Sequence, residues 1–93
     1  MIKHIVMWTL KTPTDAASFK TQLVSCQNVV SGVAAFEVAT KTVALAGSCD
    51  VVLYLKFNSA AVLAAHWMHP HRQAVAAVLD LLRQSCVDMD CEA

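Results

Sequence analysis

The chain has 93 residues, of which 57% are hydrophobic and 15% are charged, and seven basic residues balance seven acidic ones. This length fits one domain, residues 1–93, with a single core. Because the charges are dispersed and sum to zero, the chain offers no basic surface for nucleic acid. No apolar run approaches the ~20 residues that cross a bilayer. The N-terminus lacks the pattern of a secretory signal, so we expect a cytoplasmic protein without a membrane partner.

The four cysteines, at positions 26, 49, 86 and 91, form no C-x-x-C pair. Cys86 and Cys91 are five residues apart and would point to opposite faces of a strand. We therefore expect reduced, mostly buried thiols rather than disulfides or a zinc site.

The first elements follow from residue type and spacing. Residues 2–10, "IKHIVMWTL", are rich in β-branched and aromatic side chains and predict a strand. The middle of this strand is apolar on both faces, which indicates that both faces are covered. Pro13 to Asp15 provide helix-start residues, and apolar side chains then recur at helical spacing, which predicts a helix from about 15 to 29.

The second half of the chain predicts two more strands, a broken helix and a last strand. Gly32 precedes the strand 33–43, and "DVVLYLKF" (50–57) is strongly β. Ser59 is a plausible N-cap for a short helix. Pro70 suits the first turn of a new helix, 70–84, because proline disfavours helical geometry at the preceding residue. Residues 85–91 then form an edge-like strand.

This order, β-α-β-β-α-β, is typical of a ferredoxin-like α+β fold, an antiparallel sheet with helices on one face. The opposite face would be bare in a monomer, although the first strand is apolar on that side as well. Two such sheets packed face to face would close a barrel. We therefore expect a homodimeric α/β barrel that assembles through the open sheet face.

The sequence also resembles a known family, the stress-responsive A/B barrel domain (Dabb) proteins. The resemblance covers nearly the whole chain and rests on "MIKHIV", Gly32, "DVVLYLKF" and above all "HWMHPHRQAV". The last segment is similar to the family signature Tyr-x-x-His-Pro-x-His-x-x-Val. The best-characterised member of the family is a polyketide cyclase, in which the Tyr and the second His of the signature do the acid–base chemistry.

Transferred residue by residue, the signature places His69 and Pro70 on the family's His-Pro pair. His66 takes the position of the Tyr, and Arg72 takes that of the second His. His4 matches a histidine of the first strand near the cyclase cleft. Both catalytic identities therefore differ from those of the cyclase, while His66, Arg72 and His4 remain the candidate catalytic residues.

The residues themselves leave two interpretations of "HWMHPHR" open. In the first, this segment is a helix junction in which His69 caps free backbone groups and Arg72 pairs with a carboxylate. In the second, His66, Arg72 and His4 line a ligand cleft. Its further contacts would be Val6, Trp8, Phe19, Leu23, Leu53, Leu55 and His69. We expect no metal site and no cofactor, because too few histidine and carboxylate side chains would converge.

Three functional hypotheses follow. The first is a stress-associated or small-molecule-binding protein whose apolar cleft holds a small apolar or acidic ligand without efficient chemistry. The second is a cyclase-like or isomerase-like enzyme that acts on a carbonyl compound, with His66 as the base. The third is a purely structural oligomer whose cleft is filled by its own side chains.

Overall fold

A computed structural model describes residues 1–92 of the chain. Its elements are β1 (Ile2–Leu10), a 3-10 turn η1 (Pro13–Asp15), α1 (Ala16–Val24), β2 (Val33–Thr40), β3 (Val51–Phe57), α2 (Ala60–Met68), α3 (Pro70–Leu82) and β4 (Arg83–Glu92). This order confirms the predicted ferredoxin-like α+β fold, with the second helix divided at Pro70. None of the described helices is long and apolar enough to cross a membrane.

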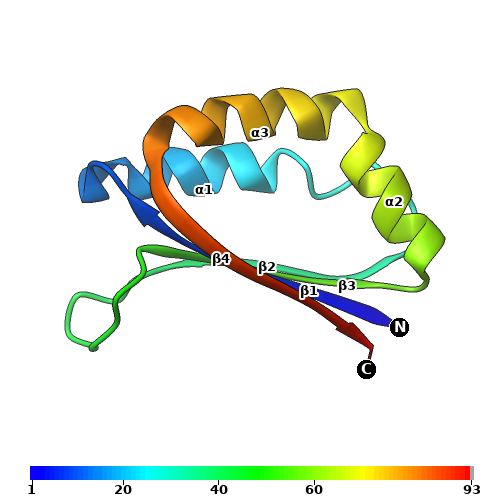
Figure 1. The fold of residues 1–93 in the computed structure, drawn as a ribbon, viewed down its shortest axis with the longest axis horizontal. Helices are drawn as coiled ribbons and strands as arrows, with labels where there is room; N and C mark the ends of the chain where they lie inside the picture. Colours follow the sequence, from blue (N-terminus) through cyan, green and yellow to red (C-terminus); the bar gives the residue numbers. More distant parts are fainter. Residues whose placement is uncertain (93) are drawn as a thin grey trace.

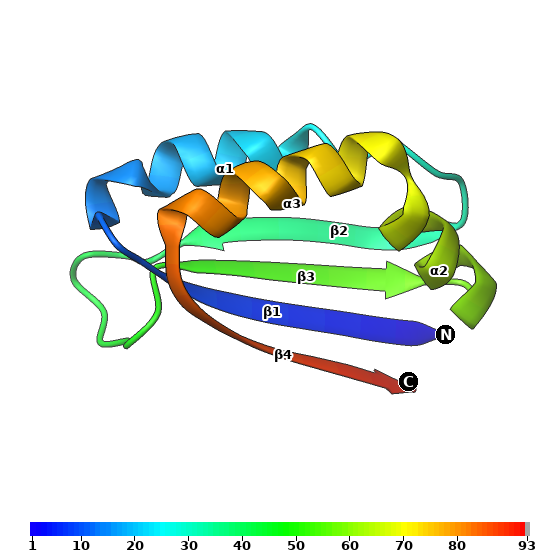
Figure 2. The same ribbon diagram turned by 45° about the horizontal axis from the view of Figure 1, so that its top comes forward.

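The four strands form one antiparallel sheet in the order β2-β3-β1-β4 (Figure 2). The chain termini therefore meet, because β4 pairs with β1 so that His4 lies opposite Asp90 and Trp8 opposite Cys86. All three α-helices lie on the same face of the sheet (Figure 1). This pairing brings β4, residues 83–92, beside β1 at the start of the chain.

Alternation along the central strands sorts their side chains between the two faces. One set on each strand is buried beneath the helices. On β1 this set is His4, Val6, Trp8 and Leu10. On β3 it is Val51, Leu53, Leu55 and Phe57. The opposite, open face carries Ile5, Met7, Val52, Tyr54, Val87 and Met89. Met7, Val87 and Met89 are exposed, so this apolar face has no cover within one chain.

The core fills the space between the sheet and helices α1 and α3. Phe19 and Leu23 from α1 and Val75 and Leu79 from α3 are buried against the sheet. The rings of Trp8 and Phe19 pack edge-on with their centroids 5.0 Å apart. The tight packing under α1 fixes the position of α3 and of the junction before it.

Three element boundaries differ from the prediction. Helix α1 ends at Val24 rather than near 29, because Cys26 and Gln27 donate to the carbonyls of Leu23 and Val24 in successive three-residue turns. Strand β2 ends at Thr40 rather than 43, and the exposed residues 41–48 form a loop. Helix α3 passes into β4 at residues 82–83, so the last strand is longer than expected.

The prediction of mostly buried thiols is wrong. All four cysteines are free, but only Cys26 is buried, whereas Cys49 and Cys91 are partly exposed and Cys86 is exposed. The reason is the position of β4, an edge strand that the helices leave largely uncovered. Cys86 and Cys91 do lie on opposite faces of this strand, as their spacing predicts.

Candidate functional site

The break between α2 and α3 is organised by His69. Its backbone is extended (φ −64°, ψ 130°), and its side-chain Nδ1 accepts a hydrogen bond from the backbone N–H of His71 at 3.1 Å. Pro70 occupies the first position of α3, where no N–H is needed. His69 therefore caps the new helix, as the helix-junction interpretation expects of it.

Arg72, one turn into α3, is only 4% exposed. Its Nη1 has no hydrogen-bond partner within residues 1–92, and the carboxylate predicted for it is absent from the same residues. Its guanidinium carbon instead lies 4.5 Å from the ring centroid of Trp67. Burial lowers the pKa of Arg72, but a guanidinium stays charged at neutral pH. Asp80, which lines the same space, acts on Arg72 from a distance, but no carboxylate of residues 1–92 forms an ion pair with it.

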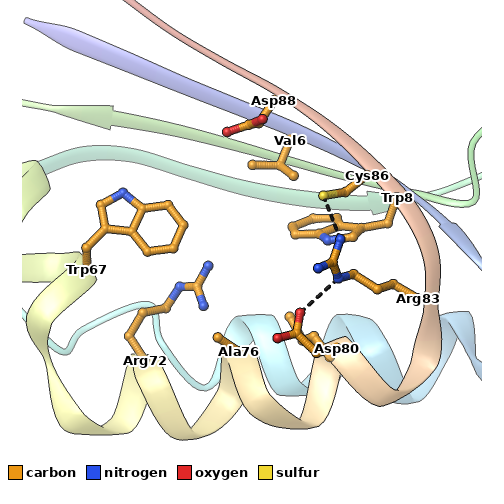
Figure 3. A pocket seen from close by; sticks show the side chains of 10 residues that line it. Val6, Trp8, Trp67, Arg72, Ala76, Asp80, Arg83, Cys86 and Asp88 are labelled. Carbon is orange, nitrogen blue, oxygen red and sulfur yellow. Dashed lines mark hydrogen bonds and ion pairs between the residues drawn. The ribbon is translucent and has the colours of Figure 1, made fainter.

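A cavity of about 170 Å³ opens in front of Arg72, between α3 and the β1–β4 edge of the sheet (Figure 3). Its lining residues are Val6, Trp8, Trp67, Arg72, Ala76, Leu79, Asp80, Arg83, Cys86 and Asp88. The guanidinium of Arg72 points into this space, and both tryptophans of the chain form part of its wall. A cavity of roughly 150 Å³ holds one benzene ring, so this one fits a single-ring molecule.

The far end of the cavity carries a second group of charges. Arg83 donates from Nε to Asp80 Oδ1 at 2.8 Å and from Nη1 to the sulfur of Cys86 at 3.1 Å. The hydrogen bond to Asp80, together with the neighbouring Cys86, raises the pKa of Arg83. Asp88 on β4 is the cross-strand partner of Val6 on β1, and it makes no ion pair within the described residues. The cavity therefore offers a cation at one end and both signs of charge at the other.

His4 and His66 lie in a buried group beside the cavity rather than in its wall. His4 Nδ1 pairs with the carboxylate of Asp90, while its Nε2 is buried without a hydrogen-bond partner in the described part of the chain. His66 packs 5.4 Å from the ring of Phe57, and its Nδ1 likewise has no partner in residues 1–92.

The environment of His66 keeps its imidazole neutral. Burial lowers the pKa of His66 to about 4, and the positive charges of Arg72, His4 and His69 add to this effect. These contributions also place the three candidate catalytic residues in one electrostatic group. Trp67 joins the group to the cavity, since its indole packs edge-on against His4 at 5.2 Å and beneath Arg72.

The ligand contacts nominated from sequence fall into separate places. Val6 and Trp8 line the cavity together with Arg72. Phe19, Leu23, Leu53 and Leu55 are instead packed in the core, where they are at most 1% exposed. His69 is occupied by its capping hydrogen bond. No group of three or more His, Cys, Asp or Glu side chains within residues 1–92 is arranged to hold a metal ion.

Seven lining residues of the cavity were not among the predicted site residues, namely Trp67, Ala76, Leu79, Asp80, Arg83, Cys86 and Asp88. Trp67 lies within the segment "HWMHPHR", but no contact to a ligand was predicted for it. For β4, the signal was the alternation of Cys86, Asp88 and Asp90 along a strand, which places these three side chains on the helix side.

Comparison with known proteins agrees with this fold. The family model of the stress-responsive A/B barrel domain, Dabb, matches residues 2–93. The chain belongs to the Dabb family. No curated protein sequence matches it significantly.

Several solved structures share the fold at low sequence identity. A dimeric ferredoxin-like protein from Bacteroides fragilis is 22% identical, with a TM-score of 0.83 over 99% of this chain and 95% of that one. A dimeric ferredoxin-like protein from Thermobifida fusca is 17% identical, with a TM-score of 0.87 over 99% and 90%. A candidate antibiotic biosynthesis monooxygenase from Deinococcus radiodurans is 17% identical, with a TM-score of 0.77 over 99% and 90%. At these identities the likeness establishes the fold alone.

Proposed function

We propose that this Dabb protein binds a small, single-ring aromatic acid in the cavity between α3 and the β1–β4 edge. The observation that carries the proposal is Arg72, a buried cation that lines an open cavity and forms no ion pair with any carboxylate of the described chain. An uncompensated buried charge is costly. A carboxylate or phenolate that enters the cavity would remove this cost and accept a charge-assisted hydrogen bond from the guanidinium.

The rest of the wall suits the same ligand. Val6, Trp8, Trp67 and Leu79 supply apolar and aromatic surface for a ring. Helix α3 begins at Pro70, two residues before Arg72. The dipole at this helix N-terminus therefore favours an anion near Arg72. Asp88 at the other end disfavours a second anionic group but can accept a hydrogen bond from a hydroxyl. A hydroxylated aromatic acid satisfies both ends.

Tryptophan fluorescence provides a direct test, because both tryptophans line the cavity. Benzoate should quench or shift the emission at saturation, and benzamide, its neutral counterpart, should bind more weakly. Arg72→Gln should reduce benzoate affinity about 10- to 100-fold, the range for a hydrogen bond to a charged group. Lys20→Gln removes an exposed positive charge on α1 and serves as the matched control. Equal affinity of Arg72→Gln and the wild type for benzoate would exclude the proposal.

A second candidate function, acid–base catalysis on a carbonyl compound, is favoured by one specific contact. Asp90 holds His4 through Nδ1 and leaves Nε2 without a partner in residues 1–92. A carboxylate-oriented imidazole with one free nitrogen is the arrangement of a general base. Because Trp67 packs against His4 and His4 does not line the cavity, the indole must turn aside before a substrate reaches Nε2.

Proton exchange at carbon tests this second function. Wild-type protein in heavy water should catalyse deuterium incorporation next to the carbonyl of acetophenone, observed by proton NMR. His4→Gln and Asp90→Asn should both abolish the exchange, whereas Glu92→Gln, an exposed carboxylate two residues further along β4 and outside the cavity, should preserve it. Exchange that persists in His4→Gln would reject His4 as the base.

The protomer is proposed to function as a homodimer through its open sheet face. The apolar side chains of that face and the dimeric state of the Bacteroides and Thermobifida relatives support this assembly. The four free cysteines support a reducing, cytoplasmic compartment. A part in the stress response stays a prediction that the family suggests.

A further inference from the structure

We infer that Cys86 is a nucleophilic thiol of the cavity, able to capture an unsaturated carbonyl compound bound there as a thioether. The inference rests on the proposed acid-binding function for the position of the ligand, but the reactivity of the thiol has its own structural basis.

The first argument is the contact between Cys86 and Arg83. A guanidinium N–H points at the sulfur from 3.1 Å, and Asp80 holds the same guanidinium in place at 2.8 Å. Reactive cysteines lie in partly exposed, electropositive surroundings, and Cys86 is exposed and lies beside the guanidinium of Arg83. Cys49 and Cys91 make no such contact in residues 1–92.

The second argument is the shape of the surroundings. Cys86 lies opposite Trp8 on the helix side of the sheet and forms part of the cavity wall. Figure 3 shows its sulfur and the guanidinium of Arg72 facing the same space. Arg72 is 96% buried with Nη1 unpartnered within the described chain, so the cavity contains an anion-binding group as well as the thiol. An acidic molecule held by Arg72 would thus present its other end toward Cys86.

The chemistry needs no cofactor or oxidant. The sulfur of Cys86 adds to the β-carbon of an α,β-unsaturated ketone, and the electron pair of the carbon–carbon double bond moves toward the carbonyl to give an enolate. The α-carbon then takes up a proton from water, which replaces the proton that the thiol released. The net change is addition of S–H across the double bond. The ligand class is an unsaturated ketone that carries a carboxylate.

Rates of alkylation at each cysteine test the thiol. Iodoacetamide, a neutral reagent, is applied near neutral pH, and peptide mass spectrometry follows all four sites. Cys86 should react about ten-fold faster than Cys49 and Cys91, and Arg83→Gln should lower its rate to theirs. Arg83→Lys, which keeps a positive charge, should restore part of the difference. Equal rates at the three sites in the wild-type protein would overturn the inference, as would an unchanged Cys86 rate in Arg83→Gln.

Cys26 reports whether each variant is folded. It is buried, and burial raises the pKa of its thiol, so it should stay unmodified in any folded variant. Rates from a variant in which Cys26 reacts are replaced by those of Arg83→Met, which removes the positive charge and keeps an unbranched side chain. The Cys86 rate should fall in this variant as well, and an unchanged rate there would overturn the inference.

Acetylacrylate and its methyl ester separate this inference from the proposed function. The ratio of the acid's rate to the ester's rate should be higher at Cys86 than at Cys49, which lies outside the cavity and reports the intrinsic reactivity of the two compounds, and Arg72→Gln should remove that preference. Fast iodoacetamide labelling of Cys86 without a preference for the acid would support the thiol and reject the anion site. Slow labelling of Cys86 together with benzoate binding that depends on Arg72 would reject the reactive thiol and support the anion site.

Discussion

Arg72 lies over the face of Trp67, with its guanidinium carbon 4.5 Å from the ring centroid, while the ring of His4 lies nearly perpendicular to the same indole with the two centroids 5.2 Å apart. One side chain of α2 therefore supports the cation of the cavity on one side and the histidine paired with Asp90 on the other. Trp67 is 37% exposed, so this support lies at the surface of the protein. The indole is thus the physical link between the anion-binding cavity and the histidine group.

Replacement of Trp67 should therefore affect both stability and binding. Trp67→Leu removes the cation–π contact and should lower the free energy of unfolding in urea by about 1 kcal/mol. It should also weaken benzoate binding, because Arg72 loses the surface that holds its side chain in place. Trp67→Phe keeps a ring under the guanidinium and should lose less of both. Trp67→Leu with the stability and affinity of the wild type would show that this contact does not position Arg72.

The depressed pKa of His66 predicts a specific loss of stability in acid. Its pKa falls from 6.5 to about 4 on folding, so between these values the unfolded chain binds a proton that the folded chain does not. The free energy of unfolding should therefore decrease as the pH drops from about 6.5 toward 4, by up to about 3 kcal/mol. Urea unfolding at a series of pH values measures the slope.

The control for this pH dependence is His66→Gln, in which the titrating group is absent. Arg72, His4 and His69, the charged and titratable groups that act on His66, remain in place. Subtracting the two curves removes the contribution of carboxylates that titrate in the same range. A difference curve that is flat from pH 6.5 to 4 would contradict the assignment.

A side chain at Gly32 should lower the stability of the fold, whereas a side chain at Gly47 should not. The backbone of Gly32 has φ +88°, and a Cβ there would lie 2.8 Å from a methyl group of Val62 on α2. Gly32→Ala should lower the unfolding free energy by about 1–3 kcal/mol, because both the left-handed conformation and the close approach oppose a side chain. Gly47→Ala, whose Cβ meets no atom of the described residues within 4 Å, should change stability little. Equal stabilities would contradict this reading.

A charge on the open sheet face should separate the proposed dimer. Met89 on β4 is 59% exposed on that face, whereas Met68 at the end of α2 is 71% exposed away from it. By analytical ultracentrifugation at micromolar concentration, the wild type should sediment at twice its chain mass of 10.0 kDa. Met89→Lys should shift this species toward the monomer, and Met68→Lys should leave it unchanged. A monomeric wild type would exclude the assembly.

Much of the fold could be predicted because its signals are local. The β-branched runs predict β1 and β3, Ser59 and Pro70 begin the two halves of the divided helix, and alternation on β1 assigns its faces. The capping role of His69 also followed from the sequence, since proline forces an extended residue before a new helix. Each of these features depends on neighbours within one turn or strand.

Arg72 was a candidate from the sequence, but its isolation could be seen only in three dimensions. A motif shows that a cation begins a helix; it does not show whether a carboxylate elsewhere in the chain reaches it. Similarly, the apolar pattern of Phe19, Leu23, Leu53 and Leu55 is the same for a packed core as for a cavity wall. The packing of α1 against the sheet decided in favour of the core.

The sequence alone therefore determined the order of the elements, the two alternating sets of side chains on β1 and the junction at Pro70, because hydrophobic period and backbone geometry act over short distances. The tertiary structure decided which groups form the site. The pairing of β4 with β1 joins His4 to Asp90 across 86 positions of the chain and places Cys86 and Asp88 before Arg72. Such contacts arise from the strand order of the sheet, which no local spacing specifies.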